Sequence, residues 1–246
     1  MAFLYCGSQE RVADGFQAAF DCLKNFDPAV DADEKLWQTR HKIVVRYTVP
    51  SGVLPGKENF QVVWKYYREK RFFRYLFRPS LAFREWQGYK RVEALEIPCA
   101  KVLAAAEKRC GVKLKESVFV TELVPCSGDG DDFCPGGKYE NDGELAREFA
   151  EKNLRLLARL HRAKLVHGGF TPRNELYLLE PETDSPSGNR LRVVWIDLAT
   201  CRKVPFYKRK KLQKKDVDCF LSMLKLSSGE EAGLRQIYLE ELKKNG

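Results

Sequence analysis

Four residues of the chain are of types that bind phosphate groups and divalent metal ions. They are Lys65, Glu85, Asn174 and Asp197. Lys65 follows an apolar run, Asn174 closes the segment 167–174, and Asp197 follows a second apolar run over 193–196. A triphosphate carries concentrated negative charge, so transfer of its terminal group needs fixed cations and a magnesium ion held by hard oxygen ligands. These residue types, in this order, indicate chemistry on nucleotide phosphates.

Each of these residues has an ordinary structural explanation when it is taken singly. A lysine in a strand usually lies at the surface, and an asparagine after a turn is usually a turn former. Together, however, they resemble the parts of a protein-kinase-like phosphotransferase. The resemblance implies that Lys65 binds nucleotide phosphates, that Glu85 on the next helix orients Lys65, and that Asn174 and Asp197 hold the metal.

Further segments resemble the lipopolysaccharide core kinase family, whose members are the bacterial Kdo and heptose kinases. Between about residues 43 and 224, these segments are Lys65–Arg68, Ser80–Trp86, Glu96–Pro98, Leu157–His161, Val166–His167, Ile196–Leu198 and Lys215–Asp218. The resemblance implies a two-lobed kinase-like fold, and ATP with magnesium or another divalent cation as cofactors. It also implies phosphorylation of a sugar in the inner core of a lipid anchor.

One position departs from the family pattern. Five residues before Asn174, where the family has its catalytic aspartate, the sequence has Gly169, which cannot accept a proton from a sugar hydroxyl. The adjacent residues offer no carboxylate, and nothing in the sequence argues that Asp184, in the following loop, folds back to replace it.

The missing base leaves two hypotheses open. General acid–base assistance is worth about 10²–10⁴-fold, and phosphoryl transfer depends mainly on positioning and charge neutralisation. The chain is therefore either a kinase with weak or altered catalysis, or a pseudokinase that binds nucleotide or glycolipid and regulates a partner.

The hydrophobic pattern predicts the elements that position these residues. Strands are expected over 43–49, 60–67, 117–123, 175–179 and 191–196, and helices over part of 8–24 and over 80–95, 144–164, 216–224 and 230–243. Ser80 is expected to be the N-cap of the second helix. Strands followed by a helical half predict an α+β, kinase-like fold with an N-terminal lobe over 1–124 and a helical C-terminal lobe over 125–246.

The composition is that of a globular protein. Among 246 residues, 44% are hydrophobic and 31% are charged, which excludes a disordered chain. No stretch reaches about 18 apolar residues, so no membrane span is expected, and the N-terminus does not resemble a secretory signal. The eight cysteines form no Cys-x-x-Cys pair, which favours reduced thiols over a zinc ribbon. We expect a cytoplasmic protein that could attach peripherally to the inner membrane.

The net charge of +9 indicates an anionic partner. Basic residues gather in two runs, over 65–78 among aromatics and over 202–215 with no acidic residue. The first run is explained equally well as a solvated charged face. The second favours a surface for an anionic glycolipid, a lipopolysaccharide core sugar or bilayer headgroups. Single-stranded nucleic acid is the rival partner, and the lack of a recognised nucleic-acid motif argues against it.

Three more polar residues have expected structural roles. His161 is expected to hydrogen-bond a loop, and His167 to brace the segment 167–174. Asp216 has two interpretations that are compatible with each other: it caps the start of a helix, or it steadies that segment through its backbone.

Overall fold

The computed structural model describes residues 9–24, 26–28, 30–54, 58–68, 78–110, 113–181 and 189–244. The chain divides into two compact units, which are Met1–Gln87 with Ala100–Leu123, and Gly88–Cys99 with Val124–Gly246. Helix α2 (Leu81–Glu93) is divided between them, since its residues up to Gln87 belong to the first unit and those from Gly88 to the second. The expected lobes, 1–124 and 125–246, differ from this division in residues 88–99 and in Val124, which group with the second unit.

The first unit is built on a six-stranded antiparallel sheet in the order β1-β5-β6-β4-β3-β2. Its strands are β1 (Gln9–Val12), β2 (Glu34–Gln38), β3 (Lys42–Thr48), β4 (Gln61–Arg68), β5 (Val102–Cys110) and β6 (Lys113–Glu122). Helix α1 (Gln17–Leu23) packs on one face. Successive strand residues point to opposite faces, and Val62, Trp64 and Tyr66 of β4 enter the core with α1. Lys65 and Tyr67 consequently lie on the other face.

The predicted strands over 43–49, 60–67 and 117–123 are confirmed as β3, β4 and β6, and the helix after Ser80 is confirmed as α2. The prediction over 8–24 is correct only from Gln17, because residues 9–12 pair with β5 instead. Strand β5 was not predicted because Ala104, Ala105 and Ala106 have weak strand propensity. All three are fully buried, and pairing with β6 imposes the strand.

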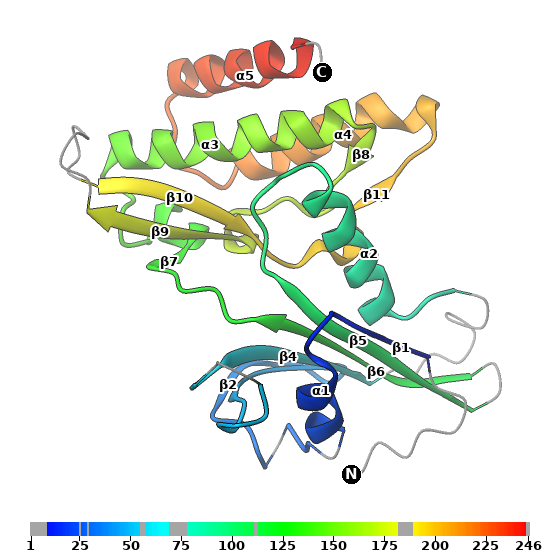
Figure 1. Cartoon of the computed structure of the whole chain (residues 1–246). Coiled ribbons are helices and arrows are strands. Elements are labelled where there is room, and N and C mark those ends of the chain that lie inside the picture. The colour runs from blue at the N-terminus through cyan, green and yellow to red at the C-terminus, as the bar shows by residue number, and fades with distance from the viewer. Residues whose placement is uncertain are drawn as a thin grey trace. The chain divides into compact units, whose positions relative to one another are not determined.

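The second unit combines three long helices with a β-hairpin. Its helices are α3 (Gly143–Arg162), α4 (Phe206–Leu221) and α5 (Ser228–Lys243), and its strands are β7 (Gly128–Asp129), β8 (Leu165–Val166), β9 (Glu175–Pro181), β10 (Asn189–Trp195) and β11 (Arg202–Lys203). Strand β9 lies between β7 and β10, and β8 pairs with β11. Figure 1 shows α3 lying between the β9–β10 hairpin and α5. The Nε1 atom of Trp195 donates to Oδ1 of Asn153 at 2.9 Å, which joins the hairpin to α3.

The predicted hairpin and the predicted helices over 144–164 and 230–243 are confirmed as β9–β10, α3 and α5. Helix α3 begins where Asp142 accepts a hydrogen bond from the backbone N of Leu145 at 3.0 Å. Helix α4 begins at Phe206, well before the predicted start at residue 216. Its first half is basic and largely exposed, so it lacks the apolar period that identifies a helix.

Candidate active site

Lys65 and Glu85 form a buried ion pair in the first unit. The Nζ atom of Lys65 lies 2.6 Å from Oε1 of Glu85, and the two residues are 7% and 0% exposed. The pleat of β4 directs Lys65 away from the core that contains α1. A buried charge without a partner is strongly destabilising, so the burial of each side chain depends on the other.

The start of α2 is tied to strand β5, and this tie fixes the helix that carries Glu85. Oγ of Ser80 accepts from the backbone N of Phe83 at 3.3 Å, as predicted for an N-cap residue. The backbone N of Ser80 donates to Oε2 of Glu107 at 3.1 Å. Arg109 donates to the other oxygen of Glu107 at 2.6 Å, which compensates the charge of this carboxylate.

Tyr67 is a third member of the Lys65–Glu85 cluster, and the sequence analysis missed it. Its hydroxyl donates to Oε2 of Glu85 at 2.5 Å, so each oxygen of this carboxylate has a donor from β4. The signal in the sequence was the two-residue spacing of Lys65 and Tyr67, which puts both side chains on one face of the strand.

Asp216 of α4 holds the segment 167–174 through its backbone. Its Oδ2 accepts from the N of His167 at 2.8 Å, and its Oδ1 accepts from the N of Gly168 at 2.9 Å. The same carboxylate lies 3.2 Å from Nε2 of His161, whose Nδ1 lies 2.8 Å from the hydroxyl of Tyr238. His161 of α3 therefore links the Asp216 carboxylate of α4 to Tyr238 of α5. His161 contacts helix residues and not the loop for which it was predicted.

The ring of His167 is fully buried and braces the segment by packing. It makes edge contacts with Phe170 and Trp195, with ring centroids 5.2 Å and 5.6 Å away. Neither ring nitrogen has a hydrogen-bond partner among the described residues. Burial lowers the pKa of His167 to about 4, so the ring is neutral at physiological pH.

Asn174 and Asp197 lie on neighbouring segments of the second unit. The backbone N of Ile196 donates to the carbonyl of Asn174 at 2.9 Å, which pairs the two segments. Nδ2 of Asn174 donates to the carbonyl of Gly169 at 3.1 Å, leaving the amide oxygen as the group suited to a cation. Asp197 has left-handed backbone angles, φ 56° and ψ 55°. For a non-glycine residue such angles are strained, and such strain is concentrated at functional sites.

Solved structures share this fold. "WaaP in complex with acyl carrier protein" is 18% identical, with a TM-score of 0.64, and the match covers 94% of this chain and 89% of that chain. The Rio2 kinase-ADP/Mg2+-phosphoaspartate complex from Chaetomium thermophilum is 16% identical, with a TM-score of 0.56. That match covers 93% of this chain and 66% of the Rio2 chain. At these identities the likeness shows the fold, which is kinase-like.

The model of the lipopolysaccharide kinase (Kdo/WaaP) family matches residues 36–237. The chain belongs to this family. The predicted family and the predicted kinase-like fold are thus confirmed. A comparison with curated proteins finds no match.

Gly169 lies five residues before Asn174, where the sequence analysis expected a catalytic aspartate. The φ angle of Gly168 is +78°, a conformation that favours glycine, whereas that of Gly169 lies outside the left-handed region. A Cβ atom on Gly169 would meet only Oγ1 of Thr200, at an ordinary contact distance of 3.5 Å. The backbone therefore tolerates a side chain at residue 169, and glycine there is not a steric requirement.

Glu175, directly after Asn174, is a buried acid that the sequence analysis did not identify. It is fully buried, and neither carboxylate oxygen has a hydrogen-bond partner among the described residues. Its strand partner is Trp195, so it shares a face of the hairpin with a fully buried aromatic ring. Burial raises the pKa of Glu175 well above its ordinary value, which favours the protonated acid.

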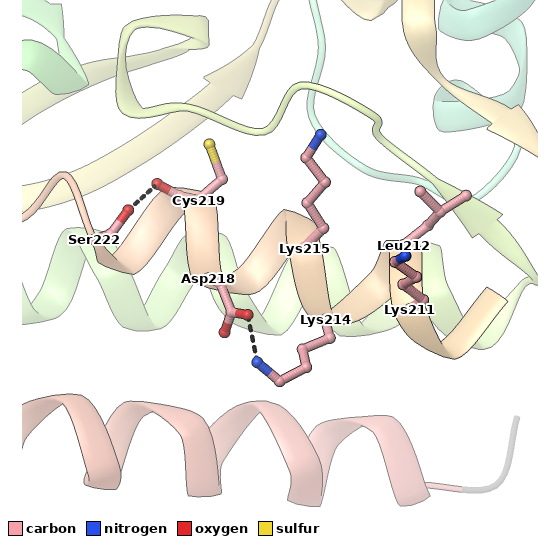
Figure 2. Close-up of a pocket in the computed structure, with 7 residues that line it drawn as sticks. All are labelled: Lys211, Leu212, Lys214, Lys215, Asp218, Cys219 and Ser222. Carbon is pink, nitrogen blue, oxygen red and sulfur yellow. Dashed lines mark hydrogen bonds and ion pairs between the residues drawn. The ribbon is translucent and has the colours of Figure 1, made fainter. Parts of the chain in front are cut away.

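A pocket of about 510 Å³ lies along α4 (Figure 2). It is lined by Lys211, Leu212, Lys214, Lys215, Asp218, Cys219 and Ser222. Figure 2 shows the side chains of Lys214 and Asp218 extending toward α5. The Nζ atom of Lys214 lies 2.6 Å from Oδ2 of Asp218. Lys215 extends away from α5 (Figure 2). Most of the second basic run, expected to form an anion-binding surface, lies on α4, whereas its first two basic residues, Arg202 and Lys203, lie on β11.

Some expectations concern residues outside those that the structure describes. They are Asp184 and residues 69–77 of the first basic run. Within the described part of the chain, no helix is both long and apolar enough to cross a bilayer. In the same part, no group of three or more His, Cys, Asp or Glu side chains is placed to hold a metal ion.

The Tyr67 hydroxyl is expected to stabilise the buried Glu85 carboxylate. Tyr67→Phe removes one of the two donors and leaves an oxygen unsatisfied, so we expect the free energy of unfolding to fall by about 1–3 kcal/mol. The measurement is denaturation by urea. Tyr66→Phe is the matched control, because Tyr66 bonds Glu116 on the opposite face at a partly buried site. Equal losses of unfolding free energy in the two variants would contradict a special role of Tyr67 as a donor to Glu85.

The buried Glu175 is expected to destabilise the fold at neutral pH. Unfolding restores its ordinary pKa near 4.5, so the unfolded state releases a proton that the folded state retains. The penalty therefore grows as pH rises from 4.5 toward the raised pKa of the folded state. We expect Glu175→Leu to be more stable than wild type, by a margin that increases by about 1.4 kcal/mol per pH unit over that window.

Urea denaturation across pH tests the Glu175 prediction. His167 titrates alike in wild type and in Glu175→Leu, so its contribution cancels in their difference. Glu58→Leu, at an exposed position, should show no such margin. A pH-independent difference between Glu175→Leu and wild type would refute a protonated Glu175.

Proposed function

We propose that the chain transfers the γ-phosphoryl group of ATP to a sugar hydroxyl of the lipopolysaccharide inner core. The observation that carries the proposal is the buried ion pair of Lys65 with Glu85. A kinase-like site needs such a pair to hold a lysine against nucleotide phosphates. Membership in the Kdo/WaaP family supports the sugar acceptor.

Each site residue has a proposed part in binding and positioning. Lys65 contacts the nucleotide phosphates, and Glu85 with Tyr67 fixes the direction of its ammonium group. Asn174 and Asp197 offer an amide oxygen and a carboxylate, which suit a magnesium ion. Magnesium is commonly bound by one or two carboxylates together with substrate phosphates, and when bound it neutralises charge on the transferred group.

Asp216 is a positioning residue in this proposal. Its two backbone hydrogen bonds hold the segment on which Gly169 and Asn174 lie. Gly169 cannot take the proton of the acceptor hydroxyl. The reaction therefore proceeds by orientation and charge neutralisation, at a rate reduced by about 10²–10⁴-fold from that of a site with a base.

The alternative function is that of a pseudokinase, which binds nucleotide or glycolipid and regulates a partner without efficient turnover. The observation in its favour is that a side chain at residue 169 would fit without strain, yet the residue is glycine. Both hypotheses place the protein in the cytoplasm, with an anionic glycolipid as the acceptor or the ligand.

Nucleotide binding tests the proposed site. We expect calorimetry to show ATP binding that depends on magnesium and is lost in Lys65→Met and in Asp197→Asn. Lys101→Met, a charge loss at an exposed position in the first unit, should bind as wild type does. If the wild-type protein does not bind ATP at millimolar concentration, the proposed phosphotransferase activity is refuted.

Restoring a carboxylate at residue 169 separates the two hypotheses. If the missing base limits turnover, Gly169→Asp should raise phosphoryl transfer to a Kdo- or heptose-containing acceptor by an order of magnitude or more. Gly169→Asn, which has nearly the same shape without a carboxylate, should not raise it. ATP binding without turnover in both variants would favour the pseudokinase.

A further inference from the structure

Helix α4 carries a basic face that the stability of the helix does not explain. Lys208, Lys210, Lys211, Lys214 and Lys215, all within its first ten residues, are exposed. Lys208 lies in the first turn, at the positive N-terminal end of the helix, where a cation is unfavourable. The first turn has no acidic residue, and Pro205 provides no capping side chain.

The lysines also repel one another. Lys211 lies three residues after Lys208 and four before Lys215, and like charges at these spacings destabilise a helix. Of the five lysines, Lys214 has a carboxylate partner, Asp218. Local rules broken in this way are characteristic of a functional surface.

Two exposed aromatic side chains lie at the start of the same helix. Phe206 and Tyr207 are 79% and 77% exposed. Tyr207, Lys211 and Lys215 follow the spacing of one helical face, whereas Lys214 extends toward α5 and pairs with Asp218 (Figure 2). This face borders the pocket of about 510 Å³, because Lys211 and Lys215 line it.

We propose that Phe206, Tyr207 and the lysines of α4 form a docking surface for an anionic lipid bilayer. Lysines attract anionic headgroups, and aromatic rings partition into the boundary between headgroups and acyl chains. Exposed aromatic rings and lysines occur together on this helix, as they do on helices that lie at a membrane surface. The inference rests on the proposed function in one respect, namely that a lipid-anchored acceptor lies at such a surface.

The opposite face of α4 carries Asp216, which holds the segment 167–174. Asp216 directly follows Lys215 in the sequence and is buried, whereas Lys215 is exposed. A helix lying on the bilayer would therefore hold this segment at a fixed position relative to the headgroups, and the candidate site would meet acceptors that remain anchored in the membrane.

Sedimentation with vesicles tests the docking surface in the absence of nucleotide and acceptor, so its outcome does not depend on catalysis. We expect the full chain to sediment with phosphatidylcholine vesicles that contain phosphatidylglycerol. It should remain in solution with phosphatidylcholine alone. Binding should weaken as salt is added, because salt screens exposed charges.

Matched variants locate the surface on α4. Replacing Lys208, Lys211 and Lys215 together by Gln should lower the partition coefficient about 100-fold, since each exposed cation contributes several-fold. Lys101, Lys115 and Lys243 replaced by Gln are the control, with the same charge change at exposed positions elsewhere. Phe206→Ser with Tyr207→Ser should also weaken binding, whereas Leu36→Ser with Trp37→Ser on β2 should not.

Three results would overturn the proposal. One is the absence of sedimentation with anionic vesicles. Another is an equal loss of vesicle binding in the control lysine variant, which would show that binding depends on net charge and not on α4. The third is tight, salt-sensitive binding of a short oligonucleotide or an acidic protein without vesicle binding, which would assign the surface to that partner. ATP binding measured on the same variants shows whether the proposed nucleotide site is intact, and so separates the two hypotheses.

Discussion

A carboxylate that is removed from water must be met by donors or lose its charge, and this constraint organises both units of the protein. Glu85 is held by Lys65 and Tyr67 from one strand. Asp216 is held by two backbone N–H groups. In each case the carboxylate fixes a segment that carries candidate chemistry, because its burial is stable only while those donors stay in place. Glu175 is the contrast: it has no donor among the described residues, and its raised pKa follows from that.

In the proposed phosphoryl transfer, charge neutralisation and proton acceptance are tasks of different residues. The first is assigned to Lys65, Asn174 and Asp197, and the second would fall to residue 169, which is glycine. On this proposal the lack of a base leaves nucleotide binding intact. Gly169 is accommodated without strain and without a packing requirement, so we expect a side chain there to alter the chemistry and not the fold.

Helix α4 has two sides with different roles. Its buried side supplies Asp216 to the segment 167–174, and its outward side presents aromatic rings and lysines. Because these faces belong to one rigid helix, an interaction on the outer side would be coupled mechanically to the position of that segment. Val217 and Phe220 are buried on the inner side of α4, whereas Lys208 lies in its first turn, where a cation is unfavourable.

The sequence by itself determined the family, the kinase-like fold class and the elements whose side chains repeat with a clear period, such as α3 and β4. It also indicated Lys65 with Glu85 as a pair, because the motif residues occur in a recognisable order. Only the tertiary structure decided the rest. Tyr67 as a donor, Glu175 as an unpaired acid and the alanine-rich β5 depend on what lies opposite them. The first turns of α4, from Phe206, lack a periodic apolar pattern, so the sequence did not reveal where this helix begins. Periodicity is a local property of the chain, whereas burial and hydrogen-bond pairing join residues far apart in sequence and are settled only when the chain is folded.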